Sequence, residues 1–301
     1  MRAVVTGGAG FIGSHLADAL VARGDDVHVV DNLATGSRDN VPGEAVLHER
    51  DVREPLDDVF AAARPEVVFH LAAQADVGTS VERPDLDAEV NVLGTVRVLE
   101  AARAAGAQVV FSSTGGAIYG ECPRPAREDD RREPLSPYGT SKLAGEEYLA
   151  TWNRLHGTRH VSLRFANVYG PRQLARLEGG VVAIFLDRLR DGASARIFGD
   201  GEQTRDFVFV ADVVEALLAA VGHAGGVFNV GTGVPTSVNR LYDACSAAAG
   251  RGDEPEHGPA RPGDLRNSAL DPAAAARALG WQARESLESG LRRTWDWVSA
   301  R

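Results

Sequence analysis

The chain has 301 residues, 44% of them hydrophobic, enough to bury the core of one large α/β unit or of two closely packed lobes. Its 42 acidic and 32 basic residues give a net charge of −10, which argues against a nucleic-acid partner. The two distant cysteines, Cys122 and Cys245, favour a reducing setting, the scattered histidines predict no metal site, and no apolar run reaches the roughly 18 residues that span a membrane.

The chain begins with an expected strand at residues 2–6, a glycine-rich turn at residues 7–13 and a helix at residues 14–23. Strand, glycine turn and helix in this order form a phosphate cradle, because glycines let the backbone approach the ligand and the helix presents free N–H groups. A G-x-x-G-x-x-G triplet can also be only a tight turn, but this context favours a dinucleotide site. The early strand leaves no room for a signal peptide, so we expect a cytoplasmic protein.

A second strand, at residues 26–30, is followed by Asp31, about twenty residues after the glycines. A carboxylate there would hydrogen-bond the ribose hydroxyls and repel a 2′-phosphate, so the expected cofactor is NAD rather than NADP. Arg38 could soften this preference, or it could be an ordinary surface residue.

The next elements are a strand at residues 45–49, a helix at 54–64, a buried strand within residues 66–74 and a long helix at 85–106, interrupted by Gly94. The buried strand runs into small residues, against which a cofactor can lie, and His70 within it reads as a core residue. A further strand at residues 108–113 ends in the hydroxyls of Ser112, Ser113 and Thr114. Such a cluster is often only turn chemistry, but ligands of parallel sheets bind beyond the carboxyl ends of the strands.

Tyr138 and Lys142 stand four residues apart in a helix expected at residues 138–156, so both side chains can point into one cleft. A free tyrosine titrates near pH ~10, and a neighbouring ammonium group favours the phenolate. The pair can therefore shuttle a proton at neutral pH, although the same spacing also occurs by chance on solvated helix faces.

The second half contains an expected strand at residues 160–165, a helix at 179–190, a short strand at 195–199 and two helices within 271–301. Arg205 and Arg261 are candidate pyrophosphate clamps, because guanidinium groups match paired phosphate oxygens, but either could instead pair with a surface carboxylate. The residues Trp281, Trp295 and Trp297 read as core anchors.

The chain resembles the extended short-chain dehydrogenase/reductases, and among them the NAD-dependent nucleotide-sugar epimerases of the UDP-glucose 4-epimerase type. The matching stretches follow the family order: TGGAGFIGSHL, Asp31-Asn32-Leu33, HLAAQADV, FSSTGGAIYGE, SPYGTSKLAGE, RFANVYGPRQ, GDGEQTRDFVFVADV and RPGDLR. The resemblance implies an α/β fold with a Rossmann-like doubly wound parallel sheet and a smaller C-terminal α/β substrate-binding lobe. Residues 1–165 would form the NAD-binding domain, and the chain would return to this domain around residues 206–230. Residues 166–205 and 231–301 would bind the nucleotide sugar.

The resemblance also implies the ligand contacts. The cofactor contacts would be Gly7, Gly10, Phe11, Ile12, Gly13, Asp31, Asn32, Asp51, Val52, Leu71, Ala72, Ala73, Gln74, Asn91, Ser112, Tyr138, Lys142 and Phe165. The substrate contacts would be Thr114, Val181, Arg205 and Arg261, with Asn167 at the diphosphate, Ile197 and Phe198 in the strand against the uracil, and Asp264 at the ribose. A homodimer would form through the helices at residues 85–105 and 138–156.

The implied reaction inverts C4 of a UDP-hexose. Tyr138 removes the proton of the 4-hydroxyl while a hydride passes from C4 to NAD. The resulting 4-keto sugar rotates in the pocket before the proton and the hydride return to it. Lys142 would lower the tyrosine pKa, and Thr114, with Ser113 or Ser112 as substitutes, would hydrogen-bond the sugar oxygen. Related dehydratases and decarboxylases carry an acid just after the hydroxyl cluster, whereas Gly115-Gly116-Ala117 follows it here. A non-catalytic NAD-binding regulator is the alternative from another class, but the tyrosine, the lysine and the glycine turn are intact.

The identity of the hexose stays open at this point. Ser268, four residues after the aspartate of RPGD, is small, and in similar epimerases a small residue there admits an N-acetyl group. The loop at residues 173–179 is short and contains Arg176, so a sugar that carries a carboxylate is also a candidate substrate. UDP-glucose or UDP-galactose, UDP-N-acetylglucosamine and UDP-glucuronate are therefore all candidates.

Overall fold

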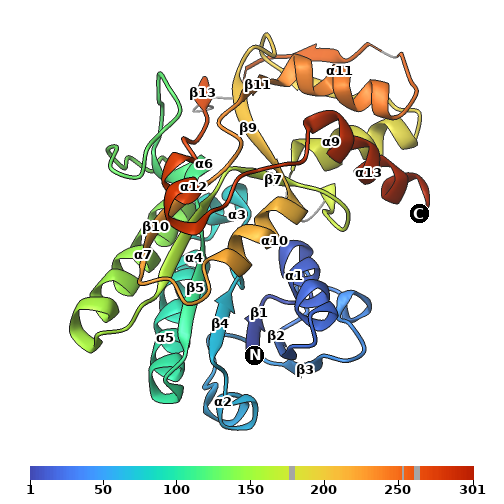
Figure 1. The fold of residues 1–301 in the computed structure, drawn as a ribbon. Helices are drawn as coiled ribbons and strands as arrows, with labels where there is room; N and C mark the ends of the chain where they lie inside the picture. Colours follow the sequence, from blue (N-terminus) through green and yellow to red (C-terminus); the bar gives the residue numbers. More distant parts are fainter. Residues whose placement is uncertain (176–179, 253, 261–264) are drawn as a thin grey trace.

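The computed structural model describes residues 1–175, 180–252, 254–260 and 265–301, and its centre is a seven-stranded sheet (Figure 1). The strand order is β10-β6-β5-β4-β1-β2-β3, and all neighbouring strands in it are parallel. This order, which reverses direction at β1, confirms the predicted doubly wound sheet. The strands are β1 (Arg2–Thr6), β2 (Asp26–Asp31), β3 (Val46–Glu49), β4 (Val67–His70), β5 (Gln108–Thr114), β6 (Val161–Phe165) and β10 (Gly226–Val230).

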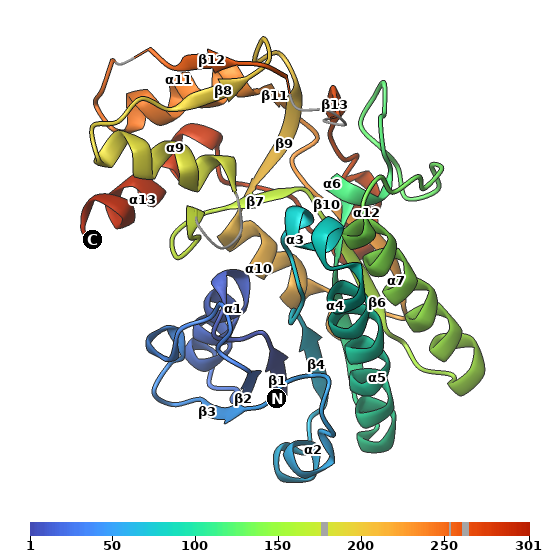
Figure 2. The same cartoon turned by 180° about the vertical axis from the view of Figure 1, so that it is seen from behind.

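Helices cover both faces of this sheet (Figures 1 and 2). One face packs against α1 (Phe11–Ala22), α10 (Val210–Ala219) and α12 (Ala273–Leu279), and the other against α2 (Asp57–Ala63), α5 (Gly94–Ala105) and α7 (Pro137–His156). Because successive side chains of a strand point to opposite faces, Val5 packs into the first core and Val4 into the second. The inner strands are thus buried on both sides, which explains their apolar runs, whereas the edge strand β3 has no buried residue.

A smaller lobe lies beyond the carboxyl ends of the central strands, above them in Figure 1. Its strand β9 (Thr204–Phe209) pairs with β7 (Asn167–Tyr169), β11 (Pro235–Ser237) and β13 (Asn267–Ser268), while β8 (Arg196–Phe198) pairs with β12 (Glu256–Gly258). Its helices are α9 (Val181–Arg190), α11 (Val238–Ala248) and α13 (Leu287–Ser299). These elements share a separate apolar core around Phe185, Leu241 and Leu291.

The glycine turn is shorter than predicted, because α1 begins at Phe11 rather than at residue 14. Gly10 has an extended backbone and is the N-cap, so Phe11, Ile12 and Gly13 already form the first helical turn. Other boundaries also differ: the helix expected from residue 54 begins at Asp57, and the strand expected within 66–74 ends at His70. Within the described ranges, no helix has the length and apolar character to cross a membrane.

The long helix expected at residues 85–106 is divided. It consists of α4 (Pro84–Ala88), a π-helical turn η2 (Glu89–Leu93) and α5, and a further helix α3 (Val77–Glu82) precedes it. The predicted interruption at Gly94 is thus a π turn that ends just before this glycine. A Cβ at Gly94 would lie 2.9 Å from Val52 Cγ2, so the glycine allows the helix to pack closely on the loop after β3. Several further elements were not predicted. They include the short η1 (Arg38–Asn40) and α6 (Gly115–Ile118), the helices α3, α10 and α11, and the strands β7, β9, β10, β11, β12 and β13.

Candidate active site

A cavity of about 1310 Å³ extends from the glycine turn, past the carboxyl ends of the central strands, into the smaller lobe. Most residues predicted to contact the cofactor or the substrate line it. They are Gly7, Gly10, Phe11, Ile12, Gly13, Asp31, Asn32, Asp51, Val52, Leu71, Ala72, Ala73, Gln74, Ser112, Ser113, Tyr138, Lys142, Phe165, Asn167, Val181, Ile197, Phe198 and Arg205. Segments that lie far apart in the sequence therefore meet around one space.

Among the described residues, two predicted contacts do not line this cavity. Asn91 and Thr114 are buried, with exposed fractions of 2% and 9%, and lie behind or beside the residues that form the cavity wall. Arg261 and Asp264, like Arg176, lie outside the described residues.

The glycine turn forms a cradle that side chains would fill. Gly7 has a left-handed backbone with φ of 71°, and a Cβ on it would lie 2.7 Å from the backbone nitrogen of Ala72. A Cβ on Gly13 would lie 2.1 Å from the carbonyl oxygen of Gly7. The turn therefore keeps the start of α1 open to a ligand, and its free N–H groups suit the pyrophosphate of a dinucleotide such as NAD.

Asp31 lies at the end of β2 beside this cradle. One carboxylate oxygen accepts a hydrogen bond from the backbone N–H of Ala9 at 2.9 Å, and the other accepts one from Leu33 at 2.8 Å. Burial raises the pKa of Asp31, while these two N–H donors act in the opposite direction. The two bonds fix a carboxylate with free acceptor capacity at the cavity wall, where a ribose hydroxyl can donate to it.

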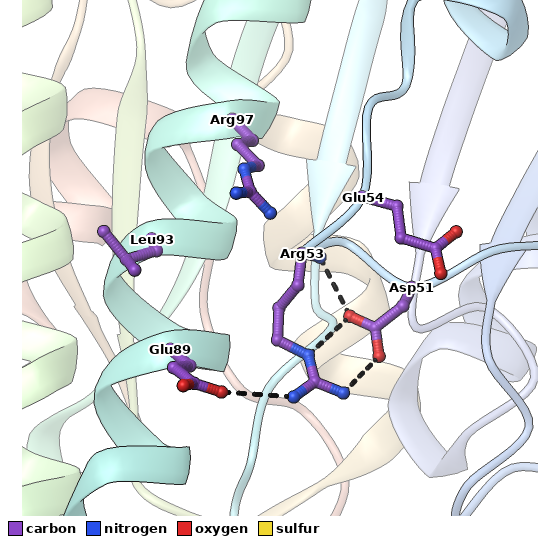
Figure 3. A pocket seen from close by; sticks show the side chains of 6 residues that line it. All are labelled: Asp51, Arg53, Glu54, Glu89, Leu93 and Arg97. Carbon is purple, nitrogen blue, oxygen red and sulfur yellow. Dashed lines mark hydrogen bonds and ion pairs between the residues drawn. The ribbon is translucent and has the colours of Figure 1, made fainter.

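Asp51, beyond β3, is held by an arginine that the sequence analysis missed (Figure 3). Arg53 donates from Nε and Nη2 to the two oxygens of Asp51, at 3.0 and 2.8 Å, and reaches Glu89 of η2 at 3.4 Å. The guanidinium holds the pKa of Asp51 well below its usual range. A side cavity of about 360 Å³ adjoins this group, lined by Asp51, Arg53, Glu54, Glu89, Leu93 and Arg97. The arginine follows Asp51 by two residues, a spacing that could have indicated it.

Asn91 supports the loop after β4 from the π turn. Its amide both accepts from the backbone N–H of Gln74 and donates to the carbonyl oxygen of Gln74, each at 2.9 Å. The same Nδ2 donates to Ser141 Oγ of α7 at 3.1 Å. Asn91 thus fixes the cavity wall at Gln74 without lining the cavity. His70 is a core residue as predicted: it bonds Thr6 and Thr95, and burial lowers its pKa to about 3.

The helix α7 brings Tyr138 and Lys142 to the cavity. Ser136 caps the helix by accepting a hydrogen bond from the backbone N–H of Gly139 at 3.2 Å. Lys142 is 3% exposed, and its ammonium donates to the carbonyl oxygen of Ser112 at 2.9 Å. Burial lowers the pKa of Lys142 to about 8, against the opposing effect of Asp87 and Glu146. It is also the only lysine of the sequence, which otherwise uses arginine for its basic side chains.

The three hydroxyls at the end of β5 have different partners. Ser112 donates to the carbonyl oxygen of His70 at 3.1 Å, and Ser113 donates to Glu146 Oε1 at 2.5 Å. A Cβ built on Gly116 would lie 4.0 Å from Thr114 Oγ1 and 3.7 Å from Asn167 Oδ1, so both side chains border the open space at Gly116. The Ser113 hydroxyl is thus committed to a buried carboxylate, whereas Thr114 lies on the side of Asn167.

The part of the cavity in the smaller lobe is rich in arginine. Arg205 of β9 donates from Nη1 to the carbonyl oxygens of Thr204 and Leu265, both at 2.8 Å. Arg188 and Arg196, which were not predicted, also line the cavity. Arg196 stands in β8 next to the buried Ile197, so the alternation of a strand would have indicated it. Three guanidinium groups therefore supply local positive charge in an acidic protein.

Comparisons with a family model, with relatives and with solved structures show what the chain is similar to. The model of the NAD dependent epimerase/dehydratase family matches residues 3–231. The UDP-glucose 4-epimerase of Mycolicibacterium smegmatis is 48% identical over 304 residues, which cover 98% of this chain and 97% of that protein. The structure of UDP-glucose 4-epimerase from Thermotoga maritima with UDP-glucose has a TM-score of 0.96 at 46% identity, covering 99% of this chain and 98% of that one. The structure of UDP-glucose 4-epimerase from Thermus thermophilus in complex with NAD has a TM-score of 0.94 at 45% identity, covering 99% of both chains.

Proposed function

The chain belongs to the NAD dependent epimerase/dehydratase family, and on this premise we propose that it inverts C4 of a UDP-hexose with NAD as its cofactor. One observation carries this proposal. A single cavity joins the glycine cradle, the Tyr138 and Lys142 pair, and the arginine-lined part of the smaller lobe. A dinucleotide and a nucleotide sugar can therefore meet at one tyrosine.

In this proposal Tyr138 is the proton shuttle. NAD, when bound, supplies the reversible oxidation of the sugar carbon. The Tyr138 phenolate accepts the proton of the 4-hydroxyl, and it returns this proton after the 4-keto sugar has turned over in the cavity. Lys142 stabilises the phenolate, because its ammonium is a positive charge held in a site of low polarity. Thr114 donates a hydrogen bond to the reacting sugar oxygen.

The cofactor would be held by chain segments around the first half of the cavity. The cradle at Gly7 and Gly13 takes the pyrophosphate, and Asp31 takes the adenosine ribose. Asp51, fixed by Arg53, would meet the cofactor together with Val52. Because the oxidation is reversed within each turnover, the cofactor is not consumed and should remain bound on purification.

The substrate would be anchored by its diphosphate and base rather than by its hexose. Arg205 and Asn167 are the proposed diphosphate contacts, and β8 is proposed to lie against the uracil. Anchoring remote from C4 leaves the hexose free to rotate, which epimerisation requires. UDP-glucose and UDP-galactose are the first substrates to test. UDP-N-acetylglucosamine is the next, because the small Ser268 would leave room for an N-acetyl group.

Elimination chemistry is less well supported. A dehydratase or decarboxylase needs an acid or base for a second carbon, and α6 offers Gly115, Gly116 and Ala117 directly after Thr114. A protein that only bound NAD would not need the Tyr138 and Lys142 pair for proton transfer. Epimerisation uses these residues without a further acid.

We also propose a homodimer, formed through α7 and the helices around η2. Exposed apolar side chains within residues 85–105 and 138–156 support this surface: Leu93 of η2 is 54% exposed and Leu155 of α7 is 69% exposed. The proposed division of the chain remains residues 1–165 with 206–230 for NAD, and the rest for the nucleotide sugar. A cytoplasmic setting is proposed from the two free cysteines, Cys122 and Cys245.

The test is to incubate the purified protein, without added cofactor, with UDP-glucose, UDP-N-acetylglucosamine or UDP-glucuronate and to follow the anomeric protons by NMR. The proposal predicts a C4 epimer from at least one of them, and NAD released on denaturation. A 4-keto or decarboxylated product would instead support elimination chemistry. Absence of any product even with added NAD would reject the enzyme assignment.

A further inference from the structure

A row of polar side chains crosses three neighbouring strands at the carboxyl end of the central sheet. The strand register pairs Ser113 of β5 with Arg164 of β6, and Arg164 with Asn229 of β10. The exposed fractions of the three residues are 3%, 2% and 0%. Buried polar groups are costly unless each has a partner, so such a row needs a complete set of hydrogen bonds.

Glu146 of α7 supplies the central partner of this row. Arg164 donates to its two carboxylate oxygens, from Nε at 2.9 Å and from Nη2 at 2.7 Å. The hydroxyl of Ser113 donates to Glu146 Oε1 at 2.5 Å. The remaining nitrogen of Arg164, Nη1, donates to the hydroxyl of Tyr119, which in turn donates to Asn229 Oδ1 at 2.8 Å. The network is connected from α7 to the far strand of the sheet.

The spacing on α7 links this network to the catalytic pair. Tyr138, Lys142 and Glu146 follow one another at intervals of four residues, so they share one face of the helix. Lys142 holds the carbonyl oxygen of Ser112, and Glu146, one turn later, holds the hydroxyl of Ser113. Two adjacent residues of β5 are therefore bonded to two adjacent turns of α7.

We propose that Glu146, oriented by Arg164, is a positioning residue of the epimerase: through Ser113 it sets the end of β5 against Tyr138 and Lys142. The inference rests on the proposed function. It assigns Ser113 to the scaffold and leaves Thr114 as the hydroxyl that meets the sugar. An ion pair suits this task because the bidentate guanidinium fixes the direction of the carboxylate, and with it the direction from which Ser113 must donate. Small displacements of a reacting group lower the rate of catalysis, so an enzyme in which the end of β5 is held less firmly should have a lower kcat.

The experiment must separate positioning from stability. A single change at Glu146 or Arg164 leaves one charge buried without its partner, so such a variant can fail to fold. Replacing both, as E146L/R164M, removes the charges together, and buried ion pairs replaced by apolar residues often keep or gain stability. S113A removes only the link to β5, and S113T keeps the hydroxyl. The matched control is E147Q, which breaks the exposed ion pair of the next helix residue with Arg132.

All variants are purified with their bound NAD and assayed for the interconversion of UDP-glucose and UDP-galactose. We expect S113A and E146L/R164M each to lower kcat about 10- to 100-fold, with KM and bound NAD within about twofold of the wild type. Adding S113A to the pair should cost less than about a further twofold, since the pair variant already lacks the carboxylate that accepts from Ser113. S113T should recover most of kcat, and E147Q should leave it unchanged. If E146L/R164M folds and keeps the kcat of the wild type, the proposal is overturned. It is also overturned if the loss of kcat in S113A/E146L/R164M equals the product of the losses in S113A and in E146L/R164M.

Hydrogen–deuterium exchange, followed by mass spectrometry, gives a readout that does not need turnover. Peptides that cover residues 109–116 should exchange at least about tenfold faster in S113A and in the pair variant, while β2 stays unchanged. Unchanged exchange at the end of β5 overturns the positioning role even if the wild type proves inactive. Inactivity of the wild type together with the expected exchange would reject the proposed function alone. If E146L/R164M fails to fold, S113A and S113T decide the outcome.

Discussion

The ammonium of Lys142 lies 2.9 Å from the carbonyl oxygen of Ser112, and this bond joins α7 to the end of β5. The lysine is 3% exposed, so its charge is held in a site that water barely reaches. In the proposed mechanism, a positive charge in such a place stabilises the phenolate of Tyr138. Arginine would not fit the same place, because its planar guanidinium is larger than the ammonium of lysine.

The first prediction concerns the titration of Lys142, whose pKa burial lowers to about 8. Because the sequence has one lysine, protein labelled with ¹³C-lysine gives a single Cε signal. In cofactor-free protein with Tyr138→Phe, this signal should titrate near pH 8, about two units below an exposed lysine. A titration near the pKa of free lysine would contradict the burial of the ammonium.

The second prediction is the effect of this pKa on stability. Between pH 8 and 10.5 the unfolded chain keeps the Lys142 proton that the folded chain has lost, so the free energy of unfolding rises with pH in this window. Below pH 8 both states hold the proton, and the folded state is destabilised by the whole cost of burying the ammonium. We compare Tyr138→Phe with the double variant Tyr138→Phe/Lys142→Met in urea. Their difference in unfolding free energy should change by about 3 kcal/mol across the window, in favour of the lysine at high pH. A constant difference would refute the linkage.

The third prediction tests the proton shuttle. Tyr138→Phe removes the phenol oxygen and should lower kcat by about 10²- to 10⁴-fold, because general acid–base catalysis contributes this much. The bound NAD and the affinity for UDP should stay near those of the wild type. Tyr148→Phe, on the same helix and 38% exposed, is the control. Near-native turnover in Tyr138→Phe would assign the proton transfer to another group.

The fourth prediction concerns the cofactor. Asp31→Asn keeps the size of the side chain. It removes the charge to which a ribose hydroxyl would donate, and it replaces by an NH2 one of the two oxygens that accept from Ala9 and Leu33. We expect a cost of about 2 kcal/mol, or roughly 30-fold in NAD affinity. Asp26→Asn, at the exposed start of the same strand, should have no effect. The measurement is the NAD retained after gel filtration, together with calorimetric titration of NAD and NADP. Equal retention in both variants would remove Asp31 from the cofactor site.

The fifth prediction concerns the anchoring of the substrate. Arg205→Met should raise KM for UDP-glucose by about tenfold or more and change kcat less, because the diphosphate is held equally before and during the reaction. Arg240→Met removes an arginine whose partner is Glu288 on the surface, and it serves as the matched control. If Arg205→Met lowered kcat with KM unchanged, the arginine would act at the reacting carbon instead.

Local patterns explain why much of the site could be predicted. The glycine turn, Asp31 and the Tyr138 and Lys142 pair each combine a fixed spacing with one chemical task, and all of them line the same cavity. The start of α1 was misplaced because Gly10, which has no side chain to cap a helix, still serves as its N-cap. The π turn at Glu89–Leu93 has a helical sequence pattern, so its extra residue could not be read from periodicity.

The network around Glu146 shows what a sequence alone does not contain. Ser113, Arg164 and Asn229 are neighbours only through strand register, across more than one hundred residues of chain. A lone glutamate on a helix or arginine in a strand suggests a surface ion pair, and its burial appears only when the sheet is assembled. The same applies to the choice between Ser113 and Thr114, because the partner of Ser113 comes from another element.

The most direct test of the central claim follows the hydrogen on the reacting carbon. UDP-glucose carrying deuterium at C4 is incubated with the wild-type protein in ordinary water, and the products are examined by NMR and mass spectrometry. An epimerase that oxidises and reduces the same carbon within one complex predicts UDP-galactose with the deuterium still at C4. Deuterium at C6 of a 4-keto sugar, or its loss to water, would contradict the account.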